Sequence, residues 1–477
     1  MGILTRKTLE SVDEASEANK NQLKRVLGPF QLILFGIGAI VGAGLFSITG
    51  IAAAEHAGPA ILLSFLIAAI GCAFAGLCYS ELASMIPIAG SAYTYAYITM
   101  GELTAWMIGW TLILEYAIGA ATVSISWSAY LISFLHDVGI DLPVALIASP
   151  WNPTPLPDGT LATGIINLPA LMIVIIASCV LIMGIKNSAY VNAVIVSLKI
   201  GVILIFIAVG IQYINFENYS PFIPENEGTF GTFGWSGIFR AAGIIFFAYI
   251  GFDSVSTASQ ETINPQKNMP RGILGSLVIC TILYVLFAFV MLGLVSYTRL
   301  GVAAPVALAI DQTPYPWLSW AIKLAILAGF TSVILVLLLG QSRIFYAMAH
   351  DGLLPPFFAR VHPKWKTPWG ASLILVPLVG LVSAFAPLSV VGNMTSIGTL
   401  LAFSLVCAGV LILRYTHPEY PRAFRVPFVP LFPLLGIATC MIMMFSLNVE
   451  TWLRLILWLA IGLLLYYFYS RHHAIAK

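Results

Sequence analysis

The chain has very little charge for its length. Only 9% of its 477 residues are Asp, Glu, Lys or Arg, whereas 60% are hydrophobic, and ordinary soluble domains carry roughly 25% charged residues. This composition excludes a soluble globular protein. The formal net charge of +2 is small and the basic residues are scattered along the chain, which argues against nucleic acid as a partner.

Several kinds of functional site are also missing. The six cysteines lie inside apolar segments without the paired spacing of a zinc site or disulfide framework, and the seven histidines lie in loops or at helix ends. There is no phosphate-binding G-x-x-x-x-G-K-[ST] segment, and no nucleophile, base and orienting group come together. We therefore expect no metal, no cofactor and no enzymatic activity.

Long apolar runs are what the sequence does have. Spanning a bilayer takes about 20 mostly apolar residues, and runs of that length follow one another along nearly the whole chain. They predict an all-α polytopic membrane protein with twelve transmembrane helices near residues 30–54, 58–86, 103–135, 166–186, 189–213, 237–260, 270–297, 316–349, 369–387, 390–413, 428–447 and 450–470.

The basic residues predict the orientation of these helices. With the N-terminus inside, most of the 22 Lys and Arg residues fall in inner loops, and the two longest outer loops, 136–165 and 214–236, contain acidic residues but no Lys or Arg. Residues 1–29 are polar and lack the apolar core of a signal peptide. We expect a multi-pass protein of a cell membrane, the bacterial cytoplasmic membrane, with both termini cytoplasmic.

Two of the predicted helices contain segments that suit continuous helix poorly. The first has four glycines between Gly36 and Gly44, and glycine costs roughly 1 kcal/mol relative to alanine in a helix interior. Close helix packing through small residues is the alternative explanation. The sixth carries Phe246–Asp253 in mid-span, five helices later. Because five is odd, such a repeat is inverted, and paired interruptions of this kind mark a transporter's binding site.

Interrupted helices offer groups that suit an amino acid. The N–H groups at the start of one half-helix attract a carboxylate, and the carbonyl groups at the end of another attract an ammonium. The predicted substrate-binding residues are Ile40, Gly42, Ala43, Gly44, Glu115, Phe247, Ala248 and Ile250.

Four separated segments resemble the amino acid-polyamine-organocation superfamily and, within it, the cationic amino acid transporter family. They are GAIVGAGLF (Gly38–Phe46), YSELASMIPIAGSAYTY (Tyr79–Tyr95), FFAYIGFDSVST (Phe246–Thr257) and RAFRVP (Arg422–Pro427). One departure is Ala43, where many relatives carry Thr or Ser, although backbone binding there needs no side chain.

The resemblance implies a fold of five plus five inverted helices like that of the bacterial leucine transporter, with helices one and six discontinuous. The implied organisation is a cytoplasmic tail (1–29), a first repeat (30–213), a second, inverted repeat (237–413), two peripheral helices (428–470) and a short cytoplasmic tail (471–477).

Three charged residues lie deep in predicted spans, where a charge is costly and therefore a functional candidate: Glu115, Lys199 and Asp253. By resemblance, the Lys199 ammonium occupies the place of a coupling cation and acts in proton coupling, with the hydroxyls of Thr331 and Ser332 on the opposite wall. The alternative is a static counter-ion to Asp253 or Glu115. Lys323 lies nearer an outer helix end, where a long side chain can reach the surface.

The other two charges have competing interpretations as well. Glu115 either faces the substrate's side chain, which would favour cationic substrates, or is a protonated packing residue. Asp253 is predicted to tether the interrupted segment of helix six. Phe247 either closes over the substrate or packs against its neighbours.

The sequence thus predicts a secondary active transporter that takes up L-amino acids, cationic or of a broad range, with protons by alternating access. The rival functions are an exchanger of amino acids or polyamines and an amino acid sensor without transport. A channel is disfavoured, because nothing resembles a ring-forming filter. The expected partners are the amino acid, the proton and the lipid bilayer. Self-association and a small membrane partner are both left open.

Overall fold

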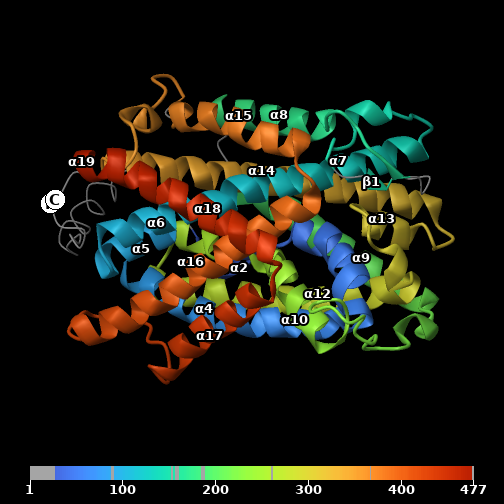
Figure 1. The fold of residues 1–477 in the computed structure, drawn as a ribbon, viewed down its shortest axis with the longest axis horizontal. Coiled ribbons are helices and arrows are strands. Elements are labelled where there is room, and N and C mark those ends of the chain that lie inside the picture. Colours follow the sequence, from blue (N-terminus) through green and yellow to red (C-terminus); the bar gives the residue numbers. More distant parts are fainter. Residues whose placement is uncertain are drawn as a thin grey trace.

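The computed structural model describes residues 27–86, 91–151, 154–155, 161–183, 189–258, 262–365 and 367–474. Most of the predicted N-terminal tail, residues 1–29, therefore lies outside the described residues. The described chain is overwhelmingly helical, and the helices run side by side along one long axis (Figure 1).

Apart from α5, which lies between two predicted helices, the helices of the first half fall within two residues of the predicted ranges. They are α2 (Pro29–Ile40), α3 (Thr49–Ala52), α4 (Ile61–Met85), α5 (Ser91–Thr99), α6 (Glu102–Ile113), α7 (Gly119–Asp137), α8 (Leu168–Met183) and α9 (Ala189–Gly210). The π-helical turn η1 (Gly44–Ile48) precedes α3, and η2 (Ala53–Ala57) and η3 (Gly58–Ala60) follow it. A third π-helical turn, η4 (Leu114–Ile118), joins α6 to α7.

The second half of the described chain also consists of helices joined by short turns. Its helices are α10 (Gly234–Ile245), α11 (Ser254–Thr257), α12 (Pro265–Leu294), α13 (Pro305–Ile310), α14 (Pro316–His350), α15 (Trp369–Phe385), α16 (Leu388–Thr416), α17 (Leu431–Ser446), α18 (Val449–Leu465) and α19 (Arg471–His473). The 3-10 turn η8 (Phe246–Tyr249) follows α10 directly, and the π-helical turn η12 (Tyr466–Ser470) follows α18.

Within the described ranges, eight helical segments are long and apolar enough to cross a membrane, and four shorter helices are also apolar: α2, α8, α15 and α17. This supports a multi-pass membrane protein. The count of twelve spans, the inverted repeat and the division into five regions stay predictions.

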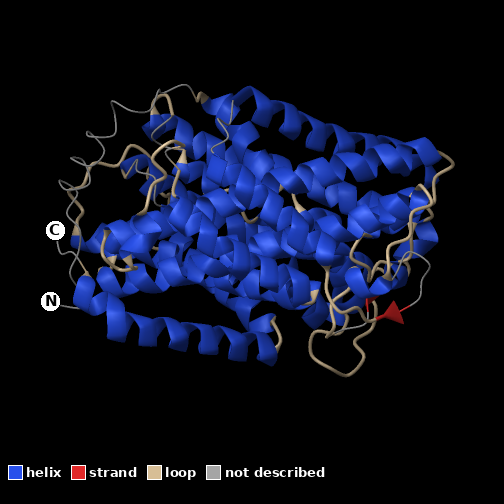
Figure 2. Cartoon of the chain, turned by 90° about the horizontal axis from the view of Figure 1, so that it is seen from above, coloured by secondary structure: helices blue, strands red, loops and turns tan. Residues whose placement is uncertain are grey.

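The sequence reading missed the small elements between the spans. One is an antiparallel pair of two-residue strands, β1 (Thr154–Pro155) and β2 (Leu161–Ala162), so the chain is not purely helical. Others are the short helices α5 and α13, which are too short or too polar to register as spans. The strand pair and α13 lie at the end of the bundle opposite α19 (Figures 1 and 2).

Burial separates central helices from peripheral ones. The most apolar window of Gly234–Ser256, which contains α10 and η8, is 89% buried inside the protein, whereas that of Val449–His473, which contains α18, is 22% buried. A membrane helix that is buried on all sides packs against protein rather than lipid. The sixth predicted helix therefore lies at the centre of the bundle and α18 at its edge.

Candidate functional site

The first interruption lies where the glycine-rich segment predicted it. Helix α2 ends at Ile40, and Val41 is extended, with ψ of 104°. Helical geometry resumes at Ala43, and the turn η1 begins at Gly44. The first N–H groups of a helix have no partner within that helix. Gly42, Ala43 and Gly44 thus stand at the start of a half-helix, as a carboxylate site requires.

The second interruption lies in the sixth predicted helix. After η8, Ile250 is extended, with ψ of 137°, and Gly251 has φ of +117°. That φ favours glycine, because a side chain would clash with the backbone. Helix α11 then begins at Ser254. The turn between Ile250 and Asp253 therefore separates two half-helices.

The two interruptions pack directly against each other. A Cβ atom added to Gly44 would lie 2.2 Å from Cα of Ala248, and one added to Gly251 would lie 2.7 Å from the carbonyl of Ala39. Only glycine permits such an approach. The sequence alone left two explanations for the glycines between Gly36 and Gly44, a helix interruption and close helix packing. Both apply to this segment.

A tyrosine that the sequence reading missed joins the two segments. The Tyr284 hydroxyl, from α12, lies 2.9 Å from the carbonyl oxygen of Ile40 and 3.0 Å from that of Ala248. These carbonyls belong to the last turns before each interruption, where carbonyls lack helical partners. The hydroxyl group has a single proton, so it donates to one of these two carbonyl oxygens at a time. The only available signal was a lone tyrosine within a long apolar run.

Lys199 reaches the first interruption from α9. It is 2% exposed, and its Nζ donates to the carbonyl oxygens of Gly38, at 2.7 Å, and Val41, at 3.2 Å. Its partners are thus backbone carbonyls rather than Asp253 or Glu115. A positive charge at the C-terminal end of α2 interacts favourably with the helix dipole.

The wall opposite Lys199 differs in detail from the expectation. A Cβ on Gly329 of α14 would lie 3.2 Å from the Lys199 stem, so Gly329 is the residue in contact. The Thr331 hydroxyl donates to Leu327 and accepts from the Trp127 indole, which places it toward α7. The Ser332 hydroxyl donates to the carbonyl of Gly329.

The two deep acids lie next to each other. Asp253 accepts a 2.5 Å hydrogen bond from the Tyr116 hydroxyl, and the carboxyl of Glu115, in η4, lies beside that of Asp253. All three residues are fully buried. The pair connects the interrupted segment of helix six to the third predicted helix. Asp253 makes no side-chain capping bond to α11, and its hydrogen bond from Tyr116 runs between two helices.

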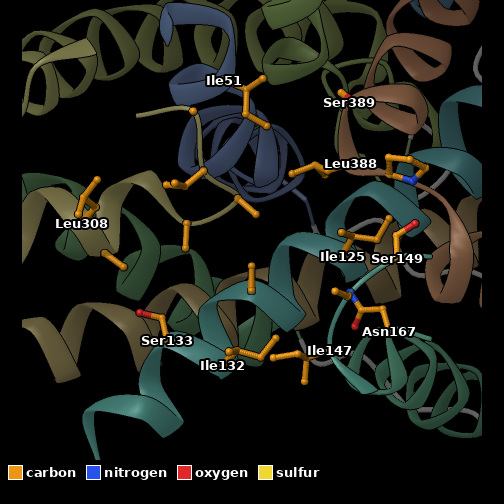
Figure 3. Close-up of a pocket in the computed structure, with 18 of the residues that line it drawn as sticks. Ile51, Ile125, Ile132, Ser133, Ile147, Ser149, Asn167, Leu308, Leu388 and Ser389 are labelled. Atoms are coloured by element: carbon orange, nitrogen blue, oxygen red, sulfur yellow. The ribbon is translucent and has the colours of Figure 1, made fainter. Parts of the chain in front are cut away.

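A cavity of about 340 Å³ lies beside α13 (Figure 3). Ile51, Ile125 and Leu388 line it, and none of the predicted site residues does. Its rim contains Asp137 and Asp311, which pair with Lys323 at 2.5 and 3.4 Å. Lys323 is 0% exposed, so it does not reach the surface as expected. It joins α7 to the segment after α13.

Two segments that were noted separately in the sequence meet at the opposite end. Glu81 of α4 accepts two hydrogen bonds from Arg414, at 2.9 and 2.7 Å, and pairs with Arg422 at 3.2 Å. It also accepts from the backbone N–H of Val426 at 2.7 Å. The YSELASMIPIAGSAYTY and RAFRVP segments therefore form one buried ionic junction between α4 and the chain after α16.

Comparison with known proteins identifies one family and several relatives of similar sequence. The sequence model of the family described as amino acid permease matches residues 27–466. The chain is 41% identical over 473 residues to the methylthioribose transporter of Bacillus subtilis, with 99% of each chain covered. It is 43% identical to the branched-chain amino acid permease BcaP of the same organism, with 99% of this chain and 98% of the relative covered. It is 35% identical to the vacuolar cationic amino acid transporter 4 of Arabidopsis thaliana, over 87% of this chain and 68% of the relative.

Proposed function

Because the chain belongs to the amino acid permease family, we propose that it is a secondary active transporter that takes up L-amino acids with protons by alternating access. The observation that carries the proposal is the pair of helix interruptions that face each other at the centre of the bundle. Backbone N–H groups at Gly42, Ala43 and Gly44 would receive the carboxylate, and the Phe246–Ile250 segment would receive the ammonium.

Proton coupling is proposed for Lys199 on its position. An ammonium that bonds the carbonyl of Gly38 in the last turn of α2 and that of Val41 at the interruption itself senses any movement of the α2 half-helix. When those carbonyls move away, the buried charge loses its partners, and desolvation then favours release of the proton. Lys199 would thereby link its own protonation to the position of the substrate-binding segment.

The cation preference suggested by Glu115 is less well supported. That preference requires the carboxylate to face the substrate, but the carboxyl lies beside Asp253. Glu115 is therefore proposed as part of the tether rather than as the contact for a cationic side chain.

The name of one relative raises a second candidate substrate. Methylthioribose is a thioether sugar without a carboxylate or an ammonium, so it would leave the proposed backbone groups unused.

Both termini are proposed to be cytoplasmic, in a bacterial plasma membrane, on the distribution of Lys and Arg.

Uptake by the purified protein in liposomes tests the proposal. A radiolabelled amino acid is offered in an imposed pH gradient, and each of the twenty amino acids and methylthioribose is tested as a competitor. Competition by amino acids, with accumulation that collapses when the pH gradient is abolished, is the expected result. Counterflow without net accumulation would indicate an exchanger, and binding without flux a sensor. Failure of every amino acid to compete would refute the assignment.

A further inference from the structure

The connection between α14 and α15 carries positive charge that its own sequence does not neutralise. Residues 352–368 include Arg360, Lys364 and Lys366 but no Asp or Glu. Lys366 lies outside the described residues. Arg360 and Lys364 are exposed, and neither takes part in an ion pair within the described part of the chain. In the proposed orientation this connection faces the cytoplasm, so it offers uncompensated positive charge at the inner membrane surface.

Hydrogen bonds hold the connection in a compact turn. The backbone N–H of His362 donates to the carbonyl of Thr367 at 2.8 Å. The Nδ1 atom of His362 accepts from the backbone N–H groups of Lys364 and Trp365, both at 3.2 Å, and the His362 ring stacks on Trp365 with centroids 4.2 Å apart. The segment from Arg360 to Trp365, called here the basic turn, therefore presents its charges from a fixed backbone, and a preorganised site loses less entropy on binding.

The basic turn is anchored to the ends of two helices. The Thr367 hydroxyl donates to the carbonyl of Ile182, in the last turn of α8, at 2.8 Å. A Cβ on Gly370, at the start of α15, would lie 2.2 Å from the carbonyl oxygen of Phe357 and 3.5 Å from Cβ of Arg360. The Arg360 guanidinium lies over the Phe357 ring, 5.3 Å from its centroid. Because α8 and α15 pack side by side at the edge of the bundle (Figure 1), the turn lies at the end of this peripheral helix pair.

The surface that continues from the basic turn along the helix pair is hydrocarbon. Met183, the last residue of α8, is exposed, and so are Leu373 and Ile374 in the second turn of α15. Trp365 is exposed in the turn itself, and tryptophan is enriched where the hydrocarbon of a membrane meets its headgroups. Positive charge therefore lies next to apolar side chains that face lipid.

We propose that the basic turn and the adjoining ends of α8 and α15 form a binding site for an anionic phospholipid. Arg360 and Lys364 bind the phosphate group, for which the N–H groups of a guanidinium are well suited. The acyl chains lie against Met183, Leu373 and Ile374. A lipid fits this surface better than a soluble phosphate does, because it supplies both an anion and a hydrocarbon chain. The site is separate from the helix interruptions and does not depend on which substrate is transported.

Lipid binding to the purified full-length protein tests the site. The protein in a neutral detergent is titrated separately with phosphatidylglycerol, phosphatidylcholine and inorganic phosphate. Native mass spectrometry measures the bound lipid, and the melting temperature reports stabilisation. Phosphatidylglycerol should bind more tightly and stabilise the protein more than phosphatidylcholine does, and inorganic phosphate at the same concentration should leave the melting temperature unchanged.

Two double variants locate the binding. Arg360→Gln with Lys364→Gln removes two charges from the basic turn, and the hydrogen bonds that shape the turn use neither side chain. Each Lys or Arg near an anionic surface contributes about fivefold to affinity, so the affinity for phosphatidylglycerol should fall roughly 25-fold. Lys267→Gln with Arg299→Gln is the matched control, because it removes two charges at exposed positions elsewhere. Its affinity should stay close to that of the wild type.

Three results would overturn the proposal. Equal binding of phosphatidylglycerol and phosphatidylcholine would show that the headgroup charge is not recognised. Equal losses in the two double variants would show a diffuse attraction rather than a site. Stabilisation by inorganic phosphate as strong as that by phosphatidylglycerol would show that the acyl chains contribute nothing. If the basic-turn variant melts early without any lipid, Lys364→Gln alone replaces it, and an unchanged affinity instead of the expected loss of about fivefold would refute the assignment.

Discussion

Replacing Lys199 with methionine gives the sharpest test of how transport is driven. Methionine keeps an unbranched apolar stem against Gly329, but it removes the ammonium that donates to Gly38 and Val41. A hydrogen bond from a charged donor contributes about 1.5–3 kcal/mol, and a buried acceptor left unpaired costs about 1–3 kcal/mol. The 2.7 Å bond lies at the strong end of this range and the 3.2 Å bond at the weak end.

Part of this loss is offset, because burying an ammonium is itself unfavourable and methionine needs no such desolvation. We expect a net destabilisation of about 2–4 kcal/mol at the interruption, which should appear as a lower melting temperature of the purified protein. Binding should weaken only partly, because the substitution leaves the backbone N–H groups of Gly42, Ala43 and Gly44, which are proposed to bind the substrate's carboxylate, in place. The main effect should be on coupling.

The assay compares two modes of transport in liposomes. Net accumulation in an imposed pH gradient should fall about tenfold or more in Lys199→Met, whereas counterflow, which needs no net proton movement, should persist. Lys267→Met provides the control, because Lys267 is exposed near the start of α12. If Lys199→Met accumulates substrate in the pH gradient as the wild type does, Lys199 is not the coupling group and the reasoning fails.

Three further substitutions test contacts that only the structure revealed. Tyr284→Phe removes the hydroxyl that serves both interrupted segments and should lower the maximal uptake rate several-fold with little change in expression; an unchanged rate would show that the bridge is dispensable. Lys323→Met leaves Asp137 and Asp311 without their buried partner; because both carboxylates are partly exposed to water, the cost should lie below the about 3–5 kcal/mol of a fully buried pair, so the melting temperature should fall modestly and the cavity rim should become more accessible to polar labels. An unchanged melting temperature would show that the ion pairs of Lys323 contribute no stability. Glu81→Gln removes a buried negative charge between two arginines and should destabilise the junction more than Glu225→Gln at an exposed position in the loop 214–236; equal melting temperatures of the two variants would contradict the importance of the junction.

The long helices were predictable because the membrane constrains each backbone segment locally. Every backbone group in hydrocarbon must be bonded within its own segment, so an apolar run of sufficient length becomes a helix. The run from Pro316 to His350 illustrates this, since the predicted range, 316–349, differs from it by one residue. Short elements such as α13, at Pro305–Ile310, escaped prediction because they follow loop geometry and tertiary contacts rather than hydropathy.

The interruptions were predictable for a related reason. Four glycines within nine positions weaken one stretch of helix whatever surrounds it, and Gly251 permits a backbone conformation that other residues rarely adopt. By contrast, the contact of Lys199 with Gly329, rather than with the hydroxyl of Thr331, depends on the rotation of α14 about its axis. Hydropathy along a helix that is apolar on all sides carries little information about that rotation.

By itself, the sequence determined that this chain is a multi-pass membrane protein, that the segments around Gly42 and Gly251 are poor helices, and that three charges lie deep within it. Those properties are local, because composition and glycine content act over a few turns of helix. Only the tertiary structure decided which residues interact: Tyr284 with two carbonyls, Glu115 with Asp253, and Glu81 with two arginines. Each joins residues far apart in the chain, and such distances are set by how the helices pack rather than by any one helix.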